Sequence, residues 1–371
     1  MVSSVEAMPH NTTLPSRTSL PTSRVWFVDN LRVLLISLVI LHHIACIYSG
    51  LPAWYYTEPP TSGAVGLGLS VFLLLNQAWF MGAFFLLSGL FTPASYDRKG
   101  PRAFLRDRLI RLGIPLLVFY FVLNPILYLG TDHGGYLHTI GSGPLWFVLA
   151  LLVLDTSYVA FRHVTRSRNR SLRPLTFRGV IVFVVALAVV TYALRIVIPM
   201  GFTVQVIDFP TADYLPQYVS FFVVGTVAYR RGWLQTTSAR MGKAGLGLAV
   251  VATLVFLPLA VGGGNWAGHG TVSSLFYALW DSSFAVGLVL GLLTFLRRRF
   301  NSQGSLRRHL SGHVFTVYVI HAFVVTAAGH ALSVLELPSL AKVAIAAVVV
   351  LPACFLLAGP VRRLPGVRRV L

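Results

Sequence analysis

The stretch LRVLLISLVILHHIACIYSG, residues 31–50, is almost entirely apolar, yet it carries Arg32 and His43. It is long enough to cross a bilayer core, which takes about 20 helical residues. At about 100° per residue, eleven steps return a helix to within roughly 20° of its starting direction, so the two side chains share one face, about 16 Å apart. Polar side chains inside a membrane usually face a bundle interior or a wet cavity. This pair therefore predicts a functional path along the helix.

The composition indicates an integral membrane protein. The chain is 56% hydrophobic and 11% charged, whereas a soluble domain has about 25% charged residues. Apolar runs long enough to span a bilayer recur along its whole length. The second is long enough to be tilted or to begin as an interfacial helix. We therefore predict an all-α, polytopic transmembrane helix bundle with ten spans: 27–49, 67–95, 109–129, 143–162, 178–199, 213–230, 243–261, 274–297, 312–331 and 338–361.

The net charge of +19 is distributed as in a membrane protein, which argues against a nucleic-acid partner. Five connecting segments contain no Lys or Arg: 50–66, 130–142, 200–212, 262–273 and 332–337. Of the 30 Lys and Arg residues, 27 fall on the opposite side of the membrane, and the exceptions are Arg32, Arg195 and Lys342. Because positive loops stay in the cytoplasm, we expect both termini to be cytoplasmic, in a multi-pass protein of the inner or plasma membrane.

Residues 1–24 are polar and rich in Ser, Thr and Pro, without a cleavable signal pattern, which predicts a disordered cytoplasmic tail. Cys46 and Cys354 fall toward opposite faces, so no disulfide is expected. No metal site is expected either. Adjacent histidines such as His42 and His43 point about 100° apart on a helix and do not converge on one ion.

His43 and Arg32 of the first span each have two possible interpretations. His43 is either a general base that takes a proton from a hydroxyl or a core histidine bonded to a neighbouring helix. His42 points to another side and is interpreted as packing. Arg32 lies three residues after Asp29, and the two can pair. Arg32 is either an anchor that reaches the interface or a clamp for an anionic cofactor or an oxyanion.

Arginines and acids elsewhere are also candidates. Arg108 and Arg111 lie together at the start of the third span, where they can bind lipid headgroups or the phosphates of a nucleotide-like cofactor. His321 lies within a late span, one turn after Tyr318. Buried acids and arginines usually pair, so Arg195 is a possible counter-ion for Asp155 or Asp281. The face without Lys or Arg is a plausible rim for a polar acceptor, and it carries Trp54, Tyr55, Tyr56, Asp132, His133, His138 and Asp208.

Five motifs, in order, resemble the acyltransferase-3 family of integral-membrane O-acyltransferases. VDNLRVLLISLVILHH resembles its opening helix, whose Arg–ten residues–His signature falls on Arg32 and His43. FFLLSGLFTP resembles the second-helix signature, and FLRDRLIRLGIPLL the basic motif with its pair at Arg108 and Arg111. GPLWFVLALLVL and SGHVFTVYVIHAF are similar to the fourth-helix motif and to the late motif that ends at His321. The DNLRV opening, in place of the common DGLRG, is closer to the family's glucan-modifying branch and does not fix a substrate.

The resemblance implies that residues 25–371 form a transmembrane acyltransferase domain. Such an enzyme moves a short acyl group from acyl-CoA, acetyl-CoA or similar, to a hydroxyl of a carbohydrate or a glycosylated small molecule. It implies catalytic roles for His43, Arg32 and His321, and donor binding by Arg108 and Arg111. A secondary transporter with an intramembrane Arg/His relay is the alternative from another class. A structural scaffold leaves the intramembrane Arg and His unexplained.

Overall fold

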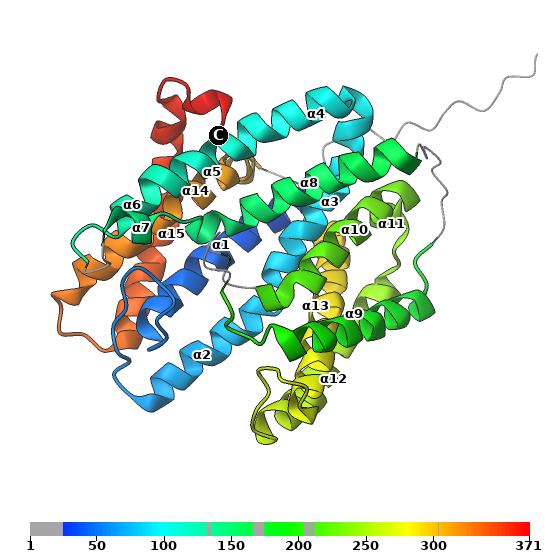
Figure 1. The fold of residues 1–371 in the computed structure, drawn as a ribbon, viewed down its shortest axis with the longest axis horizontal. Coiled ribbons are helices and arrows are strands. Elements are labelled where there is room, and N and C mark those ends of the chain that lie inside the picture. The colour runs from blue at the N-terminus through cyan, green and yellow to red at the C-terminus, as the bar shows by residue number, and fades with distance from the viewer. Residues whose placement is uncertain (1–24, 132–134, 166–173, 204–208, 210–211, 303) are drawn as a thin grey trace, which may run out of the picture.

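The structure is a computed structural model that describes residues 25–371 except 132–134, 166–173, 204–208, 210–211 and 303. The predicted tail, residues 1–24, lies outside the described residues. The regular elements over the described part are helices packed into one bundle (Figure 1). The long helices are α1 (Trp26–Tyr48), α2 (Gly63–Gln77), α3 (Phe80–Lys99), α8 (Trp146–Thr165), α9 (Phe177–Val197), α10 (Leu215–Arg231), α12 (Ala239–Gly262), α13 (Val272–Arg299), α14 (Ser305–Ser333) and α15 (Ser339–Arg363). The short ones are α4 (Pro101–Arg108), η1 (Leu109–Gly113), α5 (Ile114–Val118), η2 (Phe119–Leu123), α6 (Asn124–Leu127), α7 (Tyr136–Thr139), η3 (Gly143–Leu145), η5 (Ala212–Tyr214), α11 (Trp233–Thr236) and η6 (Val367–Arg369).

The predicted all-α membrane bundle is confirmed. Within the described residues, nine helical stretches are long and apolar enough to cross a membrane, and each corresponds to one of the ten predicted spans. The remaining predicted span is α10, which has 17 residues, at the lower end of the length that crosses a bilayer core. Two contacts show how α10 runs beside α3. Near the start of α10, the Gln217 side chain packs against Gly82, near the start of α3. Near the end of α10, the Arg230 guanidinium lies 3.7 Å from the carboxylate of Asp97, near the end of α3.

The second predicted span, 67–95, is two helices rather than one. α2 ends at Gln77 and α3 begins at Phe80, with a turn at Ala78 and Trp79. Side chains of α10 satisfy polar groups at this break: the Gln217 Nε2 donates to the Ala78 carbonyl at 2.7 Å. Irregular backbone at membrane depth is tolerated where protein covers it and supplies its hydrogen bonds. The break therefore depends on α10, which lies far away in the sequence.

The third span carries two π-helical turns, and a proline explains each of them. Because Pro115 and Pro125 lack an N–H, the regular four-residue hydrogen bond is lost at both positions. The preceding residues, Ile114 and Asn124, instead donate to carbonyls five residues back. The carbonyl of Phe121, which Pro125 cannot satisfy, accepts a 2.7 Å hydrogen bond from the Tyr136 hydroxyl. Short π-helical turns are frequent at functional sites.

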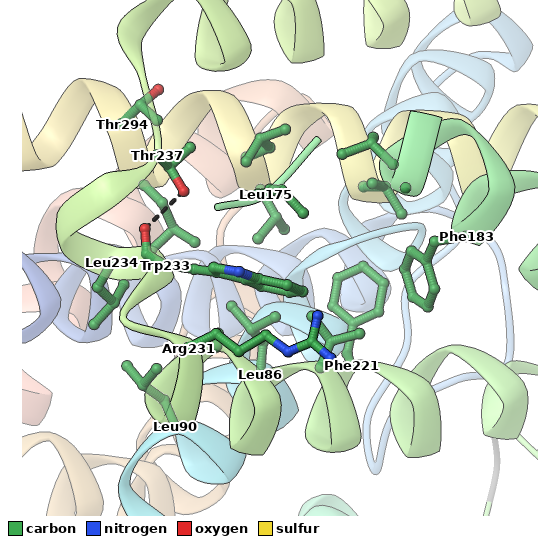
Figure 2. Close-up of a pocket in the computed structure, with 18 of the residues that line it drawn as sticks. Leu86, Leu90, Leu175, Phe183, Phe221, Arg231, Trp233, Leu234, Thr237 and Thr294 are labelled. Atoms are coloured by element: carbon green, nitrogen blue, oxygen red, sulfur yellow. Dashed lines mark hydrogen bonds between the residues drawn. The ribbon is translucent and has the colours of Figure 1, made fainter. Parts of the chain in front are cut away.

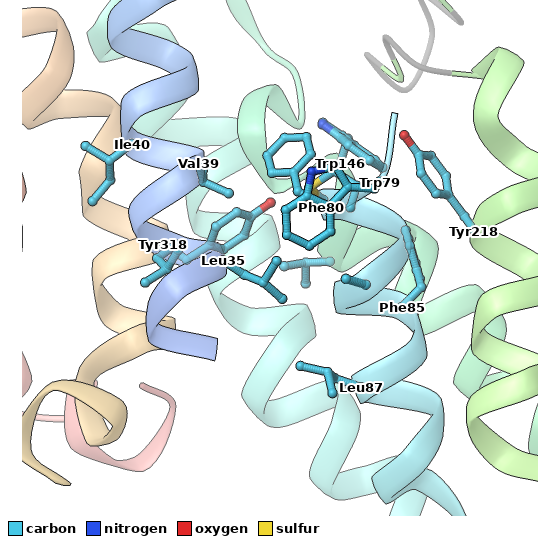
Figure 3. Close-up of a cluster of buried hydrophobic side chains, with 14 of the residues drawn as sticks. Leu35, Val39, Ile40, Trp79, Phe80, Phe85, Leu87, Trp146, Tyr218 and Tyr318 are labelled. Carbon is cyan, nitrogen blue, oxygen red and sulfur yellow. The ribbon is translucent and has the colours of Figure 1, made fainter. Parts of the chain in front are cut away.

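Helix α1 lies at the centre of the bundle, as Figure 1 shows, and contacts α2, α3, α13, α14 and α15. Leu35, Ile36 and Ile40 are fully buried. Figure 3 shows Leu35 and Val39 on the side of α1 that faces Trp79 and Phe80 at the α2–α3 break, and Ile40 on the other side of α1. The helix that carries Arg32 and His43 is thus the interior helix of the bundle, which is where intramembrane polar residues belong.

The α3–α10 contact predicts a sharp sensitivity to side-chain size. A Cβ at Gly89 would overlap the backbone of Phe222, and one at Gly225 would overlap the carbonyl oxygen of Leu86. Small residues permit such close helix packing in membranes. We expect Gly89→Ala and Gly225→Ala each to destabilise the protein by about 1–3 kcal/mol, the range for overpacked cores. The apparent melting temperature in detergent measures this effect.

Gly247→Ala is the matched control, because a Cβ at Gly247 on α12 meets no atom within 4 Å. It should leave the melting temperature unchanged. If all three variants have the same melting temperature as the wild-type protein, α3 and α10 do not pack as closely as the structure shows.

Candidate active site

Two histidines from distant parts of the chain meet in the bundle interior. The Nδ1 of His43 on α1 lies 3.0 Å from the Nε2 of His321 on α14, and the two rings are stacked with centroids 5.0 Å apart. His321 is fully buried, while His43 is partly exposed. The Nδ1 of His321 lies 2.5 Å from the carbonyl oxygen of Tyr318, one turn earlier. The two histidines therefore form one hydrogen-bonded chain.

The carbonyl at the end of this chain fixes where the protons lie. A carbonyl oxygen only accepts, so the Nδ1 of His321 carries a hydrogen. In a neutral imidazole the other nitrogen then accepts, so the His321 Nε2 accepts from the Nδ1–H of His43. This assignment leaves the Nε2 of His43 with a lone pair and no proton. In this arrangement the Nε2 of His43 can accept a proton, and the hydrogen bond to His321 fixes the orientation of the His43 ring.

The loop between α1 and α2, residues 49–62, supplies an aromatic cover for His43. The ring of Trp54 stacks on the His43 ring with centroids 4.0 Å apart, and its Nε1 donates to the Thr326 hydroxyl of α14 at 3.0 Å. The neighbouring Tyr55 hydroxyl donates to Asn124 Oδ1 of α6 at 2.5 Å. The sequence interpretation left Trp54 as a rim residue or an interface anchor. In the structure it contacts the candidate base itself.

Polar contacts hold the 49–62 loop to the last helix. The buried Lys342 Nζ lies 2.6 Å from Glu58 Oε1, and the backbone N–H of Thr61 donates to the Ser339 hydroxyl at 3.0 Å. Lys342 stood out in the sequence as a basic residue away from the basic loops, and its partner Glu58 explains this placement. Other residues of this face, Asp132, His133 and Asp208, lie outside the described residues, and His138 is exposed.

Arg32 lies near the other end of α1 and is not brought together with His43. Its NH1 pairs with Asp29 Oδ1 at 3.4 Å, as predicted, and its side chain is 36% exposed. Its guanidinium also lies 4.7 Å from the ring centroid of Phe91 on α3. The His42 ring packs on Phe80, and its Nδ1 lies 3.4 Å from the side-chain amide nitrogen of Asn76.

Arg108 and Arg111 both pair with an aspartate, but the two ion pairs differ in how buried they are. Arg108 Nε lies 2.9 Å from Asp155 Oδ2, whose side chain is only 1% exposed. The other Asp155 oxygen accepts from the Thr92 hydroxyl at 2.9 Å. Arg111 lies in the first π-helical turn, 3.1 Å from Asp107, with its side chain 64% exposed. Arg111 therefore presents the more accessible guanidinium, and Arg108 joins the third span to α8.

Arg195 and Asp281 form a separate ion pair, as the sequence suggested. They are 2.7 Å apart, and Asp213, which sequence reasoning missed, lies 3.5 Å from the same guanidinium nitrogen. Tyr214 and Tyr277 lie against the guanidinium. None of these groups contacts the histidine pair, which favours a structural role. In the part of the chain that the structure describes, no three His, Cys, Asp or Glu side chains are grouped to hold a metal ion.

Comparison with known proteins identifies the family of the chain. The family model described as an acyltransferase domain matches residues 25–359. The chain belongs to the acyltransferase-3 family. It is therefore a multi-pass membrane acyltransferase, and the transporter alternative is not supported.

Among curated proteins, the chain is 26% identical to glucans biosynthesis protein C of Salmonella typhimurium over 329 residues, which cover 81% of this chain and 84% of that protein. The same protein of Salmonella typhi is equally similar, with the same coverage. No solved structure matches the chain.

The attachment of the 49–62 loop to α15 can be tested with a single and a double variant of the Lys342–Glu58 pair. Lys342→Met leaves Glu58 without its cation in a largely buried place, and we expect a loss of about 3–5 kcal/mol, as for other broken buried pairs. Lys342→Met combined with Glu58→Gln should recover most of the loss, because no unpaired charge remains. Thermal denaturation in detergent gives the comparison. Equal loss in the single and double variants would show that the pair does not hold the loop.

Proposed function

We propose that this acyltransferase moves a short acyl group, such as acetyl, from acyl-CoA to a hydroxyl of a carbohydrate or glycosylated acceptor. We place it in the inner or plasma membrane, with both termini in the cytoplasm. The observation that carries the proposal is the hydrogen-bonded chain from the Tyr318 carbonyl through His321 to His43. This chain leaves the partly exposed His43 ring with a free acceptor nitrogen, as a general base for a hydroxyl requires.

The reaction follows from that nitrogen. The Nε2 of His43 takes the proton of the acceptor hydroxyl as its oxygen attacks the thioester carbonyl. A carbon–oxygen bond forms, the carbon–sulfur bond breaks, and the CoA thiolate leaves, taking from the His43 imidazolium the proton that came from the hydroxyl. The Nδ1–H of the resulting imidazolium still donates to the Nε2 of His321, so the charge is stabilised without a rearrangement. His321 is the positioning residue of this pair.

Donor binding is proposed at the basic end of the bundle. Guanidinium groups bind phosphates with two parallel hydrogen bonds, and coenzyme A is a cytoplasmic polyanion. Arg111 is exposed enough to contact such phosphates directly. Arg108, paired with buried Asp155, holds the π-helical turn that presents Arg111. Arg32 lies at the same end of the bundle by the predicted topology, and we propose that it positions the donor.

The acceptor is proposed to be a carbohydrate on two grounds. The relatives are named glucans biosynthesis protein C. The 49–62 loop, which contains no Lys or Arg, stacks Trp54 on His43 and packs Tyr55 against Trp54. Carbohydrate hydroxyls reaching His43 from the face without Lys or Arg meet this aromatic loop before the base. The proposed geometry therefore separates the donor, at the basic face, from the acceptor, at the opposite one.

The catalytic assignment predicts distinct losses at the two histidines. Purified His43→Ala should fold and lose at least about 10²-fold in kcat, within the range for loss of general base catalysis. His321→Ala should lower kcat with little change in the KM for acceptor, and His321→Gln should recover part of the loss, because an amide oxygen can accept from the His43 Nδ1–H. Acyl transfer from radiolabelled acetyl-CoA, measured with solubilised acceptor, gives these values.

His42→Ala is the matched control, because the His42 ring lies against Asn76 and Phe80. Near-normal turnover in His43→Ala would end the assignment of the base. An effect of His321→Ala that His321→Gln does not relieve would show a packing role only.

The donor assignment predicts effects on KM. Arg111→Gln should raise the KM for acyl-CoA at least about 10-fold, since one phosphate contact with a charged group contributes about 1.5–3 kcal/mol. Arg32→Ala should fold but lose transfer. Arg240→Gln, which removes an exposed arginine from the start of α12, is the control. Initial rates at varied acyl-CoA separate the effects, and an unchanged KM in Arg111→Gln would remove this residue from the donor site.

A further inference from the structure

A cavity of about 290 Å³ lies among α3, α9, α10 and α13, away from the histidine pair. Its wall is almost wholly apolar. Its lining includes Leu86, Leu90, Phe183, Phe221, Val289 and Leu293. None of the candidate site residues His43, His321, Arg32, Arg108 and Arg111 contributes to it. The cavity is thus a second site, and nothing in the proposed reaction uses it.

One end of this cavity is polar. Arg231, Trp233, Thr237 and Arg297 line it there, and Figure 2 shows Arg231 and Trp233 extending over the apolar side chains. Arg297 donates to the carbonyl oxygens of Leu234 and Thr237 and so ties α13 to α11. The Arg231 guanidinium lies 5.8 Å from the Trp233 ring centroid. Among the described residues, no carboxylate forms an ion pair with Arg231.

The length of the cavity matches one leaflet of a bilayer. On α13 it runs from Val286 to Arg297, eleven residues or about 16 Å of helix. That is about half of a hydrocarbon core of roughly 30 Å. The apolar end lies in the middle of the bundle, and the polar end lies at the face that carries the basic loops. Tryptophan and arginine are typical of the level where lipid headgroups begin.

We propose that this cavity binds an anionic phospholipid, with one acyl chain between α9, α10 and α13 and its phosphate at Arg231. An apolar tube that ends in an exposed cation is complementary to an amphiphile with an anionic head. Basic pockets between transmembrane helices on the cytoplasmic side are suited to such headgroups. The ligand is a resident lipid rather than the acyl donor, because no candidate catalytic group lines the cavity.

A photoactivatable phospholipid tests the site without any variant. Wild-type protein in nanodiscs is irradiated with phosphatidylglycerol that carries a diazirine on one acyl chain, and labelled peptides are identified by mass spectrometry. We expect labels to concentrate in residues 174–183 and 221–237, and excess unlabelled phosphatidylglycerol to compete for them. Labelling spread evenly over the lipid-facing helices, without competition, would overturn the proposal.

Two variants and a control identify the contacts. Ala228, a small buried residue of the lining, changed to Phe fills the cavity and should lower lipid retained after detergent washing several-fold in native mass spectrometry. Arg231→Gln should reduce the preference for phosphatidylglycerol over phosphatidylcholine about 10-fold, as expected for a lost charged hydrogen bond. Arg240→Gln, an exposed arginine outside the lining, should change neither value. Equal retention in Ala228→Phe and wild type, or acyl-CoA as the molecule retained, refutes the lipid assignment.

Discussion

Charged side chains within this bundle are stabilised by partners inside the protein, because the bilayer core offers no water. This constraint explains the ion pairs that join distant helices. Arg195 holds Asp281 and Asp213 together, and Arg108 joins the third span to Asp155 of α8. Removing one partner would leave an uncompensated buried charge, which costs far more than the intact pair contributes. These pairs therefore select one arrangement of the helices.

The same constraint governs the backbone. At the α2–α3 break a glutamine of α10 satisfies the Ala78 carbonyl, and at the second π-helical turn a tyrosine hydroxyl satisfies the carbonyl that Pro125 frees. Gln217 is remote in sequence from the carbonyl to which it donates, and Tyr136 lies beyond a loop from its own acceptor. The interruptions and their partners form one unit, since neither is stable in lipid without the other. Arg111 lies in the other π-helical turn of the third span, the one before Pro115.

Sequence patterns predict the elements well and their partners poorly. Hydropathy located nine of the spans, because spanning length is a local property, but it merged α2 and α3, whose break depends on Gln217. The spacing of Arg32 and His43 placed both on the helix that lies at the bundle centre. The pattern did not pair His43 with His321, which follows 278 residues later. Trp54 was visible only as an aromatic in a loop, because its contact with His43 depends on how the 49–62 loop folds back.

The central helix also sets a geometric condition on catalysis. Arg32 and His43 are separated by about 16 Å along α1, and the structure gives them different neighbours, Phe91 of α3 and His321 of α14. One small reacting centre cannot contact both side chains across that distance. Coenzyme A carries its phosphates and its thioester at opposite ends of a long, flexible arm, so phosphates near Arg32 are compatible with a thioester near His43. In the proposed mechanism, Arg32 therefore positions the donor, and the histidine pair carries out the proton transfer.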